Sequence, residues 1–302
     1  MLSKNITRLV QNQSKLLGNN VQYCFARQTF AEKMRQKNSV FNQNIEQGSE
    51  AAAQFTARDY VASNAGLNAF VNRVYKATGA GVTTALSTAY LASHSPFVYV
   101  HPYMTLFGGL AMTLGGIFGA SAMAPTYHVD NVQGSQALRT TNSGGRIALY
   151  GIGMAGLGLS FAPMMGMFNM VNPAIIPTSI VLSASIFGSA SLYAYTRPKD
   201  SLISWGSSLY SALFGMIGLQ LVGGITQLCI GPNMFSSALH RVDTFVGVGI
   251  FSALVAYDTH VAIQSYENGN ADHLMTSIDF ALDFWNIFVR VAEILYMFSR
   301  ND

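Results

Sequence analysis

Long apolar stretches alternate with short polar segments along most of the chain after residue 70. Because roughly 20 apolar residues are enough to cross a bilayer as a helix, each long stretch predicts a transmembrane helix. The apolar windows are about 77–94, 102–125, 145–166, 173–196, 204–228, 244–265 and 275–298. The first window is short, and the last is the most polar. The pattern therefore predicts an all-α, polytopic membrane protein with about seven transmembrane helices.

Composition agrees with a membrane protein. Half of the residues are hydrophobic and 10% are charged, whereas about 25% are charged in a typical soluble domain. Small residues within the windows, as at Ala111, Gly115 and Gly119, suit close helix packing in a bilayer. The basic residues are scattered along the chain, so we expect contact with lipid and no nucleic-acid partner.

The N-terminal segment has a different composition. Residues 1–31 are rich in Ser, Gln and Asn, and no acidic residue precedes Glu32. Its basic residues include Lys4, Arg8, Lys15 and Arg27. This composition is typical of a mitochondrial transit peptide and lacks the apolar core of a secretory signal; the alternative is a disordered cytosolic tail. We expect a transit peptide over 1–31, a polar linker over 32–70 with a helix near Ala51–Tyr60, and the membrane domain over 71–302.

Loop charges predict an orientation. Seven spans place most of the basic loop residues on the N-terminal side of the membrane: Arg58, Arg73, Lys76, Arg139, Arg146, Arg197 and Lys199. Only Arg241 and Arg300 lie on the other side. The positive-inside rule then places the N-terminal side in the compartment from which the helices insert. With the transit peptide, this predicts a mitochondrial inner-membrane protein whose mature N-terminus is in the matrix.

Each of the last two apolar segments carries carboxylates in mid-run. Asp258 lies in the first segment, Asp283 lies in the second, and a polar run with turn chemistry, 267–272, joins them. If the segments form an antiparallel helical hairpin, the midpoint of positions 258 and 283 falls at the turn. The two aspartates then lie at equal depth and face each other. Carboxylates within apolar helices are costly, so we expect these two to be functional.

The last segment carries a polar stripe. Asp279, Asp283, Asn286, Arg290 and Glu293 are spaced 4, 3, 4 and 3 residues apart, which places them on one face of a helix. One interpretation is an ion-pair ladder in which Arg290 neutralises Glu293 or Asp283. The other is a polar cavity that holds protons or cations. Three acids against one arginine leave an excess of negative charge, which favours the cavity.

Several motifs of enzymes and cofactor sites are rejected. Gly151–Gly156 matches the dinucleotide-binding pattern GxGxxG, but it lies in an apolar window without a preceding strand, so we interpret its glycines as packing residues. Leu282 precedes Asp283, so the GxGD motif of intramembrane aspartyl proteases is absent. The six histidines lie near span ends without metal-ligand spacing. We expect that the protein is not an enzyme and that it holds no tightly bound cofactor. Ca²⁺ is the ligand that we consider.

The C-terminal motifs resemble a known family, the transmembrane Bax inhibitor motif proteins. The similar residues are Tyr257-Asp258-Thr259, Glu267-Asn268-Gly269, Ser277-Ile278, Asp283, Asn286-Ile287-Phe288 and Arg290-Val291-Ala292. Together with the N-terminal composition, they are most similar to the mitochondrial branch typified by the growth-hormone-inducible transmembrane protein. The resemblance covers about residues 70–300.

This resemblance implies a seven-helix fold around a central last helix, with proton-sensitive calcium permeation or calcium/proton exchange. It implies that Asp258 and Asp283 form the proton- and cation-binding pair that controls the pore. In bacterial members an arginine in the second span also holds this pair, whereas residues 102–125 here contain no Arg or Lys. Two adjacent carboxylates share a proton, and losing it leaves a site attractive to Ca²⁺.

A second hypothesis belongs to another functional class. The chain could be a structural subunit, without transport activity, of an inner-membrane respiratory or cristae-organising complex. Its many methionine and aromatic residues are compatible with that role, and residues 32–70 would then be the docking arm. Ion conduction by a purified monomer would support the first hypothesis. Stoichiometric co-purification with a large complex would support the second.

Overall fold

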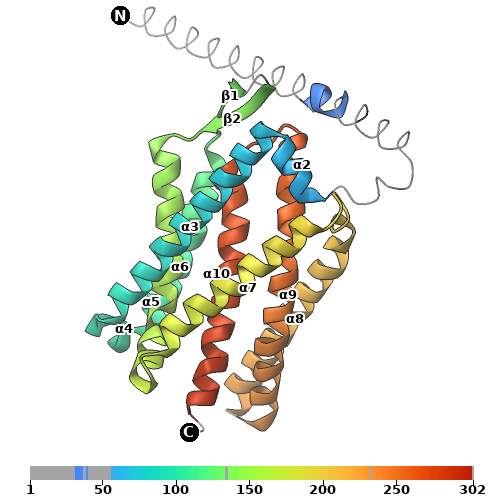
Figure 1. Cartoon of the computed structure of the whole chain (residues 1–302). Coiled ribbons are helices and arrows are strands. Elements are labelled where there is room, and N and C mark those ends of the chain that lie inside the picture. Colours follow the sequence, from blue (N-terminus) through green and yellow to red (C-terminus); the bar gives the residue numbers. More distant parts are fainter. Residues whose placement is uncertain (1–30, 37–38, 40–55, 133–134, 232, 301–302) are drawn as a thin grey trace, which may run out of the picture.

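Each apolar window corresponds to a long helix. The computed structural model describes residues 31–36, 39, 56–132, 135–231 and 233–300. The long helices in these ranges are α3 (Ala65–Ser93), α5 (Pro102–Ala122), α6 (Gly144–Val171), α7 (Ile175–Thr196), α8 (Gly206–Ile230), α9 (Met234–Glu267) and α10 (His273–Ser299). They form the bundle shown in Figure 1. The predicted fold class, an all-α polytopic membrane protein, is confirmed.

Among the described residues, five helical segments are long and apolar enough to cross a membrane: α5, α6, α7, Ile203–Gln227 and α9. The helices of the first and last windows, α3 and α10, do not combine the required length, hydropathy and small number of charged residues. In α10 the reason is the polar stripe, which places four charged side chains within the helix. Five spans are therefore supported by composition, and the count of seven stays a prediction.

The helical bundle begins earlier than the first apolar window. The short helix α2 (Ala57–Ser63) starts with a capping box in which Thr56 and Asp59 exchange hydrogen bonds. Helix α3 follows almost at once, with the Asn64 side chain capping its first turn. The short helix α4 (Pro96–Val100) and the 3₁₀ turn η2 (Ile203–Trp205) complete the helical elements between these residues and the C-terminal end of α10.

A β-hairpin between α5 and α6 was not predicted. Strand β1 (Thr126–Val132) pairs antiparallel with β2 (Ser135–Thr141), with Thr126 opposite Thr141. The hairpin covers the end of the bundle at which α9 turns into α10 (Figure 1). Alternating apolar and polar residues in 126–141 are too irregular to identify two strands from the sequence.

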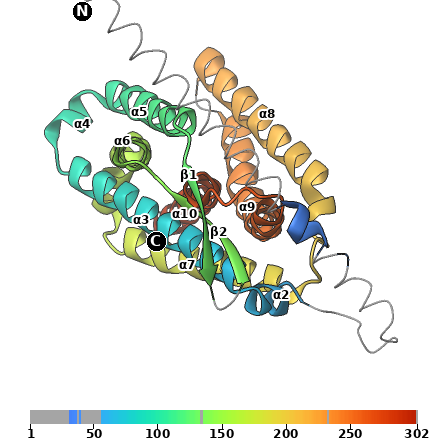
Figure 2. The same ribbon diagram turned by 90° about the horizontal axis from the view of Figure 1, so that it is seen from above.

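Helix α10 occupies the centre of the bundle. Viewed from above, α3, α6, α7 and α9 surround it (Figure 2), and it contacts all four. Ile287 and Phe288 are fully buried, and Phe288 packs edge-on against Phe161 of α6. Helix α8 lies at the outside of the bundle and packs mainly against α9. The helix that carries the polar stripe is therefore enclosed by four other helices.

Helices α5 and α6 pack with their backbones in contact. A Cβ atom at Gly156 would lie 2.6 Å from the Gly109 carbonyl oxygen, and one at Gly116 would collide with the backbone of Gly153. The interpretation of the 151–156 glycines as packing residues is confirmed for Gly153 and Gly156. Of the predicted stripe Ala111, Gly115 and Gly119, only Gly119 faces α6, where a Cβ atom would lie 3.2 Å from Leu149. Ala111 and Gly115 are exposed, because the closest contacts of α5 are made by Gly109 and Gly116.

Candidate functional site

The turn between α9 and α10 lies where the sequence placed it. Helix α9 ends at Glu267, α10 begins at His273, and Gly269 adopts a positive φ of 79° that favours glycine. Asp258 and Asp283 are thus about equally far from the turn along their helices. Their side chains face each other and are within hydrogen-bonding reach. The structure therefore brings the two aspartates together, and their role in binding protons or cations stays a prediction.

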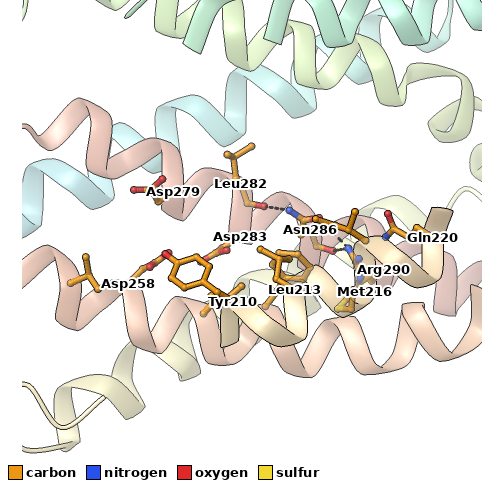
Figure 3. A pocket seen from close by; sticks show the side chains of 14 residues that line it. Tyr210, Leu213, Met216, Gln220, Asp258, Asp279, Leu282, Asp283, Asn286 and Arg290 are labelled. Carbon is orange, nitrogen blue, oxygen red and sulfur yellow. Dashed lines mark hydrogen bonds between the residues drawn. The ribbon is translucent and has the colours of Figure 1, made fainter. Parts of the chain in front are cut away.

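The pair borders a cavity between the last three helices. This acidic cavity has a volume of about 430 Å³ and is lined by α8, α9 and α10. Figure 3 shows Asp258, Asp279 and Asp283 toward one end and Gln220 and Arg290 toward the other. Apolar side chains such as Leu213, Met216 and Phe251 form much of the remaining wall. An apolar wall with a few convergent polar groups is typical of a binding site.

The three aspartates differ in their surroundings. Asp283 is buried, and its Oδ2 atom has no hydrogen-bond partner. Asp258 is half-buried, and Asp279 is exposed on the surface of α10. Asp258 and Asp279 also line a small space of about 150 Å³ at the α9–α10 turn, which extends to Asn270. Polar groups therefore continue from the acidic cavity to the end of the bundle that carries the turn.

Arg290 has a different partner from those expected. Its Nη2 lies 3.5 Å from Asp243 Oδ2, and its Nη1 donates to Asn286 Oδ1 at 3.1 Å. Among the described residues, Arg290 therefore forms its ion pair with Asp243, and Glu293 acts on it only as a nearby charge. Glu293 accepts a hydrogen bond from Thr244 Oγ1 at 3.0 Å instead. The stripe is divided: Asp279, Asp283, Asn286 and Arg290 line the acidic cavity, and Glu293 contacts the first half of α9.

Two polar residues of this region were missed. Asp243 binds Arg290, and Gln220 Nε2 donates to Asp243 Oδ2 at 3.0 Å. Asp243 immediately precedes the apolar window 244–265, so the window boundary places it in a loop, whereas α9 begins at Met234. Gln220 lies in the middle of the apolar window 204–228. The available signal was an acidic residue at the edge of one apolar window and an amide in the middle of another, both able to pair with the arginine of the stripe.

A buried ion pair fixes the turn end of the hairpin. Arg146 at the start of α6 donates to both carboxylate oxygens of Asp272 and, through Nε, to the Ala120 carbonyl at 3.0 Å. The β-hairpin adds a second connection, because Thr140 Oγ1 donates to the Ala271 carbonyl at 2.7 Å. These contacts hold the turn against α6 and the hairpin, and so they fix the depth at which Asp258 and Asp283 meet.

No preformed metal site accompanies the acidic pair. Over the described residues, no three His, Cys, Asp or Glu side chains lie close enough together to hold a metal ion. Asp258 and Asp283 form a two-carboxyl contact, from which Asp279 stands apart. The Ca²⁺-binding role given to Asp258 and Asp283 therefore requires a rearrangement or ligands from water.

A polar helix enclosed by apolar ones, with a carboxyl pair at its contact with the preceding helix, defines a polytopic α-helical membrane protein with an internal acidic site. The family model described as "Inhibitor of apoptosis-promoting Bax1" matches residues 67–300, and the chain belongs to this Bax inhibitor family. The family resemblance read from the C-terminal motifs is confirmed. The more specific assignment of this chain to the mitochondrial branch of the family stays a prediction.

Individual relatives agree with this assignment. The chain is similar to Bax inhibitor 1 from Bos taurus, with 29% identity over 144 residues, which cover 48% of this chain and 58% of the relative. Bax inhibitor 1 from Homo sapiens is 30% identical over 144 residues, covering 48% of this chain and 57% of the relative. The chain thus spans little more than half the length of these mammalian relatives. The inner membrane protein YbhL of Escherichia coli K12 is 26% identical over 242 residues, covering 78% of this chain and 94% of YbhL.

Proposed function

We propose that this protein conducts Ca²⁺ across the mitochondrial inner membrane in a pH-sensitive manner, by permeation or by exchange for protons. The observation that carries the proposal is the meeting of Asp258 and Asp283 from adjacent helices beside a cavity of about 430 Å³. Membership of the Bax inhibitor family supports it, because the family match spans residues 67–300 and so includes the helices that line the cavity.

The mechanism follows from the chemistry of two carboxyl groups. A hydrogen bond between them requires a proton on one, and the shared proton then links α9 to α10 and closes the site. Loss of that proton leaves two negative groups that repel each other. The released oxygens are the hard ligands that Ca²⁺ prefers. Asp279, exposed toward the turn end, attracts the cation to the cavity.

The location is supported by composition. The basic, acid-poor segment 1–31 suits a mitochondrial transit peptide, and all of it except residue 31 lies outside the described residues. We expect the mature protein in the inner-membrane fraction, with cleavage at about residues 27–40 and its N-terminal side in the matrix. N-terminal sequencing of the purified native protein checks this expectation. A mature chain that begins at Met1 in the endoplasmic reticulum would contradict it.

The direct test of transport is calcium uptake by proteoliposomes at about pH 6 and about pH 8. Uptake above that of protein-free liposomes is expected at both values, with the larger rate at the higher pH, because proton loss separates the acidic pair. Absence of uptake at both values would refute the proposal. If the protein then co-purifies stoichiometrically with a respiratory or cristae-organising complex, the structural-subunit hypothesis replaces transport.

A further inference from the structure

A thin polar partition separates the acidic cavity from another one. The second cavity has a volume of about 230 Å³ and lies between α8 and the first half of α9, where His240 and Asp243 line it. Gln220 lines both cavities. Arg290 lines the acidic cavity and pairs with Asp243, which lines the second. The side chains of Gln220, Asp243 and Arg290, which we call the partition, therefore lie where the two cavities meet.

The three spaces follow one another along the bundle. The small space at the α9–α10 turn shares Asp258 and Asp279 with the acidic cavity, and the acidic cavity shares Gln220 with the second cavity. Figure 3 places the aspartates and Arg290 at opposite ends of the acidic cavity. A cation that enters from the turn end therefore meets the carboxylates first and the guanidinium afterwards.

The partition is held by incompletely satisfied contacts. Asp243 Oδ1 and Arg290 Nε are buried and have no hydrogen-bond partner within the described part of the chain. The Arg290–Asp243 distance of 3.5 Å is longer than the 2.7–2.9 Å of a strong charged hydrogen bond. Unpaired buried polar atoms are costly, so the closed arrangement gives up part of the energy that a well-paired ion pair would supply. Such a contact is suited to opening.

The position of Arg290 depends on a glycine. A Cβ atom at Gly247 would collide with Nε of Arg290, so the side chain lies directly on the α9 backbone. The guanidinium also stacks on Phe251, with its central carbon 4.7 Å from the centre of the ring. A guanidinium stays charged at any physiological pH. It therefore places a permanent positive charge at the end of the acidic cavity.

We propose that Arg290 is the plug between the two cavities and the residue that determines which cations pass. Held by Asp243 and Gln220, it closes the passage, and its charge repels a divalent cation twice as strongly as a monovalent one. Passage requires the guanidinium to leave Asp243. The effect on selectivity rests on the proposed cation transport, whereas closure of the passage can be tested without any flux.

The test of closure uses a single cysteine in the acidic cavity. Leu213, which lines that cavity, is replaced by cysteine after Cys24→Ser and Cys229→Ser, and a membrane-impermeant maleimide is added in proteoliposomes to the face at which α9 begins. We expect slow labelling with Arg290 intact and labelling about tenfold faster or more in Arg290→Gln, since the amide is shorter and uncharged. Arg241→Gln, an exposed basic residue of the same helical turn as Asp243, serves as the control and should leave the labelling rate unchanged.

A second variant guards against misfolding. Arg290→Gln leaves Asp243 without its cation, so the double variant Arg290→Gln/Asp243→Asn, which removes both charges, is labelled in parallel. Equal labelling of the parent, the single variant and the double variant would overturn the proposal. If Arg290→Lys is labelled as slowly as the parent, the positive charge at this position closes the passage and the shape of the guanidinium is not required.

Flux separates this inference from the proposed function. In a transporting protein, Arg290→Gln should raise the permeability ratio of Ca²⁺ to K⁺ about tenfold, because the repulsive charge is gone. An unchanged ratio with normal transport would overturn the selectivity role. If neither the parent nor any variant carries cations, but labelling still accelerates, the proposed function fails and Arg290 remains the closure between the two cavities.

Discussion

Asp283→Asn is expected to remove the pH response of calcium uptake. For the parent protein we expect uptake to rise about tenfold from about pH 6 to about pH 8, and for the variant to change less than about twofold. The amide keeps the shape of the side chain and can still hydrogen-bond to Asp258, but the pair can no longer share and lose a proton. The measurement is initial uptake into proteoliposomes at the two pH values.

Asp258→Asn should behave in the same way, because either substitution eliminates the carboxyl pair. Asp130→Asn is the matched control, since the Asp130 side chain on β1 is 44% exposed and its only ion pair among the described residues is with Arg139. A parent-like pH response in Asp283→Asn would show that another group controls uptake. Asp279 and Glu293 would then be the next acids to replace.

Arg146→Met is expected to destabilise the folded protein by about 3–5 kcal/mol, which is the range for breaking a buried ion pair from one side. The side chains of Arg146 and Asp272 are only 1% and 9% exposed. Methionine fills much of the volume but leaves the Asp272 carboxylate and the Ala120 carbonyl without their donor. Unfolding in mixed detergent micelles, followed by circular dichroism, gives the free energy.

Two variants calibrate this result. Arg139→Met removes the Arg139–Asp130 pair, whose side chains are 55% and 44% exposed, and should cost about 0–1 kcal/mol. In Arg146→Met/Asp272→Asn the buried charge is gone, and asparagine can still cap α10 as Asp272 does. The double variant should therefore regain part of the lost stability. A loss below about 1 kcal/mol in Arg146→Met would contradict the assigned role of the pair.

The helices could be predicted because their apolar lengths are a local property of the sequence. The bilayer requirement identified the windows of α5 to α10 without any knowledge of tertiary contacts. The β-hairpin could not be found in this way, since it is held by contacts with distant residues, such as the hydrogen bond from Leu138 N to the Tyr266 hydroxyl. The start of α9 was also missed, because its first turns are polar enough to resemble a loop.

In the candidate site, too, local features could be predicted from the sequence and tertiary contacts could not. Asp258 and Asp283 could be paired by counting residues from a turn, because an antiparallel hairpin fixes depth from sequence separation alone. The partner of Arg290 could not be obtained in this way. It depends on which face of α9 packs against α10, and on Gln220 arriving from α8. Such contacts between three helices have no periodic signature in one chain.

Helix α8 separates the acidic cavity from the surroundings of the bundle. Its inner side carries Leu213, Met216 and Gln220, and its outer side exposes Phe214, Leu221 and Ile225. In a bilayer, these outer side chains rest on acyl chains, whereas on the protein side α8 is held mainly by α9. The wall of the cavity is therefore a single helix compressed from one side by lipid. We therefore expect a change in lateral pressure or bilayer thickness to move this wall and to change the size of the acidic cavity.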